Sequence, residues 1–195
     1  MLVSIGAKTI IHPHPVLVVG TYNEDGKANL MSVSWGGICC SEPPCIAISL
    51  RKATTTYHNI LRTQSFTVGI PNEDQVAIAD YVGMVSGKNE DKFKITNLNP
   101  IESLLVEAPI AEEFPFTLEC RLFKTIEIGL HTQFIGQILD IKAQESILSK
   151  EKLPDIEKVR PILYGSHGNR SYYGIGQNLG KAFESGELYM SKKKE

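Results

Sequence analysis

Cations and hydroxyl groups gather directly after an expected strand that ends at Leu50. The cluster consists of two cations and three successive threonines, namely Arg51, Lys52, Thr54, Thr55 and Thr56. A helix is expected to begin here, and the backbone N–H groups of its first turn have no partners within the helix. Such N–H groups, a guanidinium fork and hydroxyls together suit a phosphate. The alternative is an ordinary helix N-cap flanked by two solvated cations, because threonine is a common N-cap residue.

Residues 29–35 suggest a second chemistry, the binding of a flat heteroaromatic ring. In an extended segment successive side chains alternate between faces. One face then carries Asn29, Met31, Val33 and Trp35, and the other carries Leu30, Ser32 and Ser34. An apolar face with one amide, opposite a face with two small hydroxyls, fits a ring whose edge is bound by polar groups and backbone. The alternative is a barrel strand of mixed burial.

These two segments belong to an ordered set of features that resembles the flavin reductase-like, FMN-binding split-barrel proteins, in particular their flavoredoxin branch. The set covers most of the chain. Its matching segments are 14–18, 25–29, 32–35, Pro43-Pro44, 49–57, Ser86-Gly87 and 91–93.

The resemblance implies a noncovalently bound FMN in a homodimer. It places the flavin ring beside Asn29, Met31, Ser32, Val33, Ser34 and Trp35. It places the phosphate near Ser49, Arg51, Thr54, Thr55 and Thr56, with Lys92 as a further contact to the flavin or its phosphate. Residues 168–174 loosely resemble the glycine- and aromatic-rich segment that many members carry near the C-terminus.

The elements that must position these residues are mostly strands. Alternating or β-branched runs predict strands over 16–22, 29–35, 46–50, 65–70, 117–124 and 133–141, with the first two joined by a turn at 23–26. Residues 36–44 are expected to interrupt the sheet and 86–92 to form a polar loop, with short helices over 55–63 and from Asn72 to Val82. The predicted fold class is mainly β with α additions, an antiparallel split β-barrel of the FMN-binding type.

Composition favours one soluble domain over residues 1–195, with a C-terminal extension from about residue 146. The formal net charge is −2, so no global field attracts nucleic acid or an anionic membrane. No signal segment or spanning run is visible, and we expect a cytoplasmic protein.

The cysteines and histidines do not have the spacing of a metal site, and no metal is expected. Cys39, Cys40, Cys45 and Cys120 are expected to be free thiols, with Cys39 and Cys40 redox-sensitive if exposed. His12 and His14 could chelate from one side of an extended segment, but the neighbouring prolines favour a stiff lead into the first strand.

The predicted function is that of an FMN-binding flavoprotein in electron transfer or NAD(P)H-dependent flavin or ferric reduction, an FMN-dependent oxidoreductase without an assigned catalytic side chain. Its electron donor would be NAD(P)H in an enzyme or a redox protein in a carrier. His131 could donate a proton to substrate or simply be an exposed loop residue. The alternative function is a split-barrel interaction module that binds no flavin.

Overall fold

The computed structural model describes residues 1–168 and 170–190 of the chain. Asn169 of the segment 168–174 lies outside the described residues. The main body is a seven-stranded sheet in the order β3-β2-β6-β9-β10-β5-β4, and every neighbouring pair in it is antiparallel. Its strands are β2 (Leu17–Tyr22), β3 (Ala28–Val33), β4 (Gly36–Ser41), β5 (Pro44–Arg51), β6 (Ser65–Ile70), β9 (Phe116–Ile128) and β10 (His131–Ala143).

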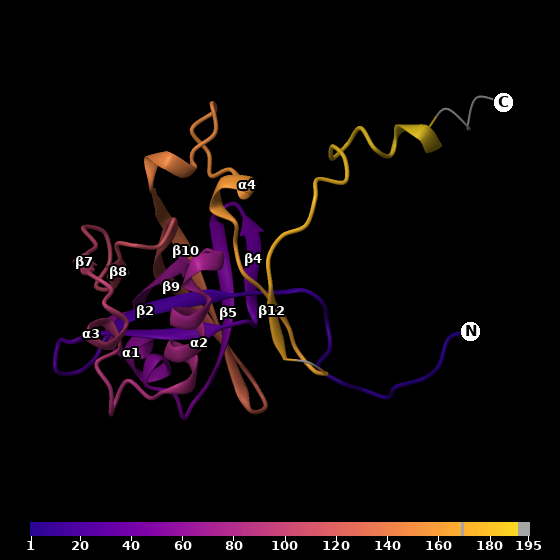
Figure 1. The fold of residues 1–195 in the computed structure, drawn as a ribbon. Helices are drawn as coiled ribbons and strands as arrows, with labels where there is room; N and C mark the ends of the chain where they lie inside the picture. The colour runs from indigo at the N-terminus through magenta and orange to yellow at the C-terminus, as the bar shows by residue number, and fades with distance from the viewer. Residues whose placement is uncertain (169, 191–195) are drawn as a thin grey trace.

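The sheet curls so that its two ends approach each other. The backbone N–H of Ser49 on β5 donates to the carbonyl of Trp35, just after β3, at 2.9 Å. Alternating side chains of the strands fill the interior with a core that includes Val19, Ile48, Phe66 and Phe134, all fully buried. The mainly β, antiparallel fold class predicted from the sequence is therefore confirmed (Figure 1).

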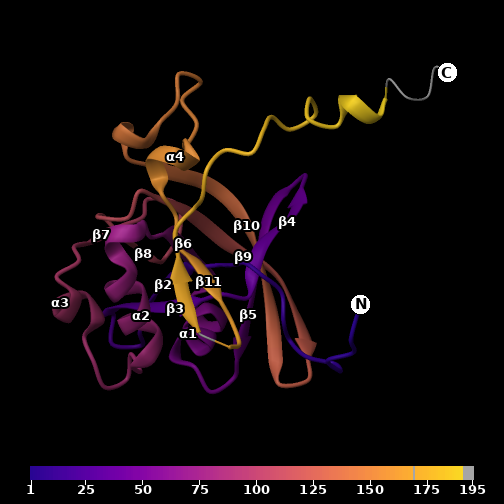
Figure 2. The ribbon, with the colours of Figure 1, turned by 45° about the vertical axis from the view of Figure 1, so that its right-hand side comes forward.

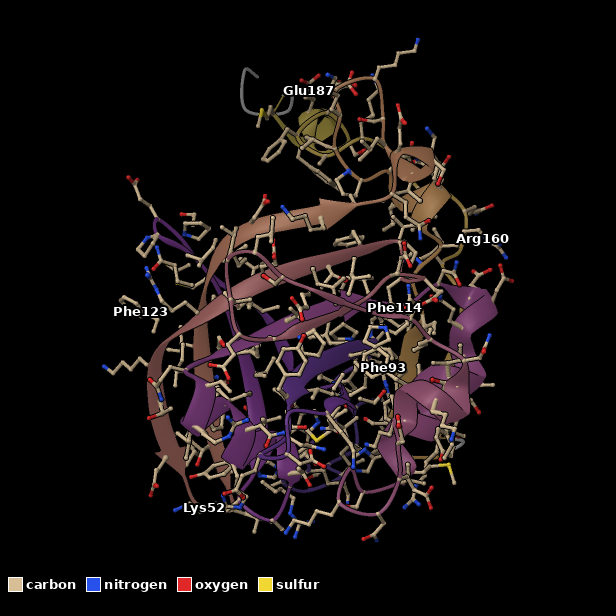
Figure 3. The ribbon with its side chains drawn as sticks, turned by 90° about the vertical axis from the view of Figure 1, so that its left-hand side faces the viewer. Lys52, Phe93, Phe114, Phe123, Arg160 and Glu187 are labelled. Atoms are coloured by element: carbon tan, nitrogen blue, oxygen red, sulfur yellow. The ribbon has the colours of Figure 1, made fainter. Side chains whose placement is uncertain are left out.

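Helices and two small sheets pack around β2 and β3. The helices are α1 (Thr55–Thr63), α2 (Val76–Met84) and α3 (Lys92–Thr96), and a short η1 (Glu73–Gln75) precedes α2. Of these, α1 contributes Tyr57 and Ile60 to the barrel core. One small sheet joins β1 (His14–Pro15), β11 (Leu163–Gly165) and β12 (Ser171–Tyr173), and the other joins β7 (Pro100–Glu102) and β8 (Pro109–Ala111). A second core, including Phe93 and Phe114, lies beneath these elements (Figure 3).

Three of the expected boundaries were wrong. The strand expected to reach Trp35 ends at Val33, and the segment expected to interrupt the sheet contains a strand, β4, paired with β5. Gly36 permits this pairing because a Cβ there would lie 2.8 Å from Leu17 Cδ1 and 2.9 Å from the carbonyl of Ala47. The expected loop 86–92 ends one residue early, because Asp91 caps α3 by accepting from the backbone N–H of Lys94.

The chain after β10 forms η2 (Glu145–Ile147) and α4 (Ile156–Val159), followed by β11 and β12. Ile147 and Val159 are buried, so this charged region is anchored by its few apolar side chains. Beyond β12 the chain runs away from the sheets to η3 (Glu187–Tyr189), and the N-terminal residues also extend away from the body (Figure 2).

Candidate functional site

The N-terminus of α1 is capped as its sequence predicts. Thr54 has extended backbone angles, and its Oγ1 accepts from the backbone N–H of Tyr57 at 3.3 Å. The same hydroxyl donates to the carbonyl of Arg51 at 2.9 Å, so the turn between β5 and α1 is closed by one side chain. Thr54 therefore serves the fold at this helix end, while the remaining first-turn N–H groups stay available for a ligand.

The cations of this turn differ in their surroundings. Lys52 Nζ forms an ion pair with Glu127 at 2.8 Å, and both side chains are exposed. Arg51 is exposed and has no ion pair among the described residues. Arg51 is therefore the cation of the turn that is free to bind a phosphate.

Thr55 faces a polar cavity of about 410 Å³. Its other lining residues come from the β2–β3 turn, from α1 and from the loop before α3: Asn23, Glu24, Asp25, His58, Asn59, Gly87 and Lys88. The sequence analysis assigned no role to His58 or Lys88. Helical spacing from Thr55 would have indicated His58, one turn away, but no local pattern brings Lys88 here.

Asn29 and Thr56 connect the two predicted halves of the site. Asn29 Nδ2 donates to Thr56 Oγ1 at 3.3 Å, and both residues are buried, with 2 % and 1 % exposed. Asn29 Oδ1 is buried without a hydrogen-bond partner among the described residues. An unsatisfied buried amide oxygen is costly in a folded protein. Here the backbone of Gly87 lies against it, because a Cβ added at Gly87 would be 2.0 Å from Asn29 Oδ1.

The strand β3 has two buried faces, which the sequence pattern left open. Met31 and Val33 pack into the barrel core, while Leu30 belongs to the second core beneath the helices. Ser32 Oγ donates to the carbonyl of Ala79 on α2 at 2.5 Å. These side chains are therefore packed as expected for a barrel strand of mixed burial. The part of β3 that could still contact a flat ring is its end.

A cavity of about 290 Å³ opens at that end. It is lined by Val16, Ser32, Val33, Ser34, Asp80, Tyr164, Arg170 and Tyr172. The Tyr172 hydroxyl donates to Asp80 Oδ1 at 2.8 Å, and desolvation together with this bond raises the pKa of Tyr172 well above its ordinary value. Asp80 and Tyr164 were not predicted as site residues, because only the packing of β11 and β12 against α2 brings them here. Arg170 and Tyr172 belong to the segment 168–174, whose role the sequence left open.

Trp35 and Ser49 meet at the seam of the sheet, through the backbone hydrogen bond described above. The Trp35 ring lies 4.8 Å from the ring of His131, measured between centroids, and His131 is the residue opposite Arg51 on the neighbouring strand. His131, treated as an isolated loop histidine in the sequence analysis, begins β10 and lies between the two predicted halves.

Lys92 is the first residue of α3, and its side chain is buried, with 2 % exposed. Its Nζ donates to the carbonyls of Leu30 on β3 and Val82 on α2, both at 2.7 Å. Burial lowers the pKa of this amine to about 8. The structure thus gives Lys92 protein partners on the back of β3, and its contact with the flavin stays a prediction.

The two histidines near the N-terminus diverge. His14 is buried and its Nε2 lies 2.9 Å from Ser166 Oγ, which ties β1 to the chain after β11, whereas His12 is exposed. Among residues 1–168 and 170–190, no three His, Cys, Asp or Glu side chains are grouped to hold a metal ion. In the same part of the chain, no helix is long and apolar enough to cross a membrane.

The residues present fit the two chemistries expected of them. A free guanidinium and unpaired helix N–H groups lie at the N-terminus of α1. Hydroxyls and aromatic rings surround the end of β3, while the unpaired amide oxygen of Asn29 lies near the start of that strand. The Asn29–Thr56 hydrogen bond holds these parts in one structure. This arrangement can bind a phosphate and a planar ring in a single molecule.

Comparison with known proteins gives consistent results. The family model described as "Flavin reductase like domain" matches residues 10–173. The flavoredoxin of Desulfovibrio vulgaris (Miyazaki F) is 48% identical, covering 95% of this chain and 100% of that one, with a TM-score of 0.90. The flavoredoxin of Methanosarcina acetivorans is 31% identical, covering 97% and 100%, also with a TM-score of 0.90. An uncharacterised protein of Aquifex aeolicus is 30% identical over 84% of this chain and 85% of its own length.

Proposed function

Because this chain belongs to the flavin reductase-like family, in its flavoredoxin branch, we propose that it binds one FMN noncovalently and transfers electrons through it. The observation that carries the proposal is the Asn29–Thr56 hydrogen bond, which joins the strand expected beside the ring to the helix expected beside the phosphate.

Each end of the site would have its own task. Arg51 and the first-turn N–H groups of α1 would neutralise the phosphate, with the Thr55 hydroxyl as a further partner. Ser34 and nearby backbone groups at the end of β3 would bind the polar edge of the ring, and Asn29 would hold β3 against α1 through its bond to Thr56. Bound FMN supplies the capacity to accept and release electrons, and the chain contributes position and electrostatics.

The phosphate end supports FMN as the proposed flavin in preference to FAD. One helix N-terminus and one unpaired arginine suit a single terminal phosphate. The remaining cation of the turn, Lys52, is engaged with Glu127.

The electron donor is either NAD(P)H or another redox protein. An enzyme would have to accept a nicotinamide over the exposed ring, while a carrier would exchange electrons with a protein surface. Purified protein should therefore be incubated with FMN, desalted, and mixed anaerobically with NADH and with NADPH while the flavin absorbance is followed.

Retained flavin bands that bleach within seconds support an NAD(P)H-dependent reductase, and retained bands that do not bleach support a carrier. Loss of all flavin on desalting, together with no change in FMN fluorescence on titration, would overturn the proposal. The same experiment with FAD tests the preference, because we expect FMN to be retained and FAD to be lost.

We also propose that the protein works as a homodimer. Large apolar side chains are exposed on β4, on β9 and at the β9–β10 turn, including Ile38 (68 %), Phe123 (60 %) and Leu130 (66 %). Figure 3 shows Phe123 at the edge of the molecule, pointing away from the barrel. Exposed apolar groups of this size are typical of association surfaces, and a second copy would bury them beside the seam that carries Trp35.

A further inference from the structure

The β4–β5 hairpin places two cysteines directly opposite each other. Cys40 on β4 is the pairing partner of Cys45 on β5. In antiparallel pairs, opposed residues have Cα atoms about 4.5 or about 5.5 Å apart, depending on their hydrogen bonding. A disulfide spans Cα separations of about 4.4–6.8 Å and also needs the two Cβ atoms about 3.5–4.5 Å apart. The opposed register brings Cys40 and Cys45 within the Cα range, and a small adjustment at the turn end of the hairpin would bring their Cβ atoms together.

A third cysteine, Cys39, lies at a β-bulge. The register shifts between Ile38 and Cys40, so Cys39 is the additional residue of β4 and has no partner of its own on β5. Cys40 and Cys45, by contrast, share one side of the hairpin because paired residues project to the same face.

The thiols also differ in access to solvent. Cys40 is exposed, and its Sγ lies 3.3 Å from the carbonyl of Glu42 in the adjacent turn. Cys45 is 2 % exposed, and burial, followed by the charges of Cys39 and Cys40, raises the pKa of its thiol. Cys120 lies in the barrel core, where burial raises its pKa to about 12. An oxidant in solution therefore reaches Cys40 before it reaches the buried thiols.

We propose that Cys40 and Cys45 are an oxidisable dithiol, converted by hydrogen peroxide into a cross-strand disulfide. In the first step the Cys40 sulfur attacks one peroxide oxygen, the O–O bond breaks, and the released hydroxide takes up a proton to leave as water. Cys40 is then a sulfenic acid. In the second step the Cys45 sulfur attacks the Cys40 sulfur, the S–O bond breaks, and a second water leaves. Two thiols and one peroxide thus give one disulfide and two waters.

The position of the pair defines what the bond would change. The hairpin begins at Gly36, next to Trp35, and ends at Ser49 and Arg51, so both of its strands lead into the proposed flavin site. The bridged loop is short, so the bond adds little to stability through chain entropy. Its main effect is to protect Cys40 from oxidation beyond the sulfenic acid and to fix the turn end of edge strand β4.

The test uses the full chain and four versions of it: wild type, Cys39→Ser, Cys40→Ser and Cys45→Ser. Each is exposed to a small excess of hydrogen peroxide, quenched with an alkylating agent in denaturant, and analysed by intact mass and by digestion without reduction. Wild type should retain two of its four free cysteines, with a mass lower by two hydrogen atoms before alkylation is counted. The digest should contain a peptide linking Cys40 to Cys45, and a reducing agent should restore all four thiols.

Cys39→Ser is the matched control, because it removes the neighbouring exposed thiol and should still form the bond. Cys40→Ser should form no disulfide. Cys45→Ser should instead accumulate sulfenic or sulfinic acid at Cys40; should this buried substitution fail to fold, Cys40→Ser alone still decides the question.

Three results would overturn the proposal. They are a link between Cys39 and Cys40, a bond between two chains, and retention of all four thiols in wild type under conditions that oxidise a small-molecule dithiol. None of these outcomes depends on flavin, so the proposal stands or falls separately from the proposed function.

Discussion

Arg51 and Lys52 are adjacent in the chain, yet their surroundings give them different roles. Lys52, directly after β5, forms an ion pair with Glu127 of β9, and this contact raises the pKa of Lys52, whereas Arg51 has no ion pair among the described residues. These two neighbouring cations therefore provide a matched pair of sites for mutation, because Arg51 has no ion-pair partner among the described residues and Lys52 has one.

Replacing Arg51 with glutamine should weaken FMN binding by about 10- to 100-fold, the cost of losing charge-assisted hydrogen bonds to a phosphate. Lys52→Gln, which changes the same formal charge one residue away, should alter the affinity by no more than about threefold. Fluorescence titration of FMN against each variant gives both values. Equal losses in the two variants would show that general charge, and not a phosphate contact by Arg51, governs binding.

Lys92 offers a prediction about pH, because its pKa is about 8 in the folded protein against an ordinary value of 10.5. Between these values the unfolded chain binds more protons than the folded chain, so stability rises with pH through this window. The gain relative to Lys92→Met should reach up to about 3 kcal/mol and be complete near pH 10.5. Denaturant unfolding of both proteins from pH 7 to pH 10.5 measures it.

Other groups that titrate in this window are present in both proteins and cancel in the difference. Lys94→Met, in the same short helix but exposed, should leave the pH dependence of wild type unchanged. A difference between wild type and Lys92→Met that does not vary with pH would contradict a lowered pKa.

At the scale of elements, the first turn of α1 separates folding from binding. Thr54 caps the helix, and Thr55 faces the cavity. Thr54→Ala should lower the free energy of unfolding by about 1 kcal/mol, the usual cost of a lost N-cap. Thr55→Ala should leave stability within about 0.5 kcal/mol and weaken FMN binding several-fold. Urea unfolding and flavin titration of both variants distinguish the two roles. A Thr54→Ala variant with unchanged stability and weaker FMN binding would contradict the capping role of Thr54.

The loop before α3 approaches β3 so closely that a side chain at Gly87 has no space. A Cβ there would lie 2.0 Å from Asn29 Oδ1, the unsatisfied oxygen of the proposed site. Gly87→Ala should displace this loop, destabilise the protein by about 1–3 kcal/mol and weaken FMN binding as well. Thermal unfolding and flavin titration test both effects.

The control is Gly176→Ala, where an added Cβ meets nothing within 4 Å. It should change neither quantity. If Gly87→Ala kept full FMN affinity, the loop would not contribute to the cofactor site.

At the scale of the whole molecule, the barrel leaves large apolar side chains in solvent on β4 and β9 while its interior is filled. If a second copy covers this face, Phe123→Asp should convert the dimer into a monomer and lower FMN affinity. Leu104→Asp, at a side chain that is 95 % exposed in the loop between β7 and β8, should change neither. Sedimentation velocity at several concentrations checks the state of association, and a monomeric wild type would refute the dimer.

The sequence by itself determined six of the seven strands of the main sheet, the α1 cap and the cation-rich turn, because these depend on neighbours within a few residues. Alternation along 117–124 and 133–141 predicted strands that the structure extends, and a threonine after a strand end predicted the cap. The β4 strand escaped prediction because Gly36 and Gly37 also suit an irregular break, and only pairing with β5 distinguishes the two.

Only the tertiary structure decided which distant residues share the site. Asp80 and Tyr172 are 92 positions apart and form one hydrogen bond, while Asn29 and Thr56 are 27 apart and form another. Lys92 was predicted as a ligand contact and has protein carbonyls as its partners. Such contacts arise when separate strands and helices pack to bury their apolar faces, and the chain's local periodicity carries no record of which polar groups that packing brings together.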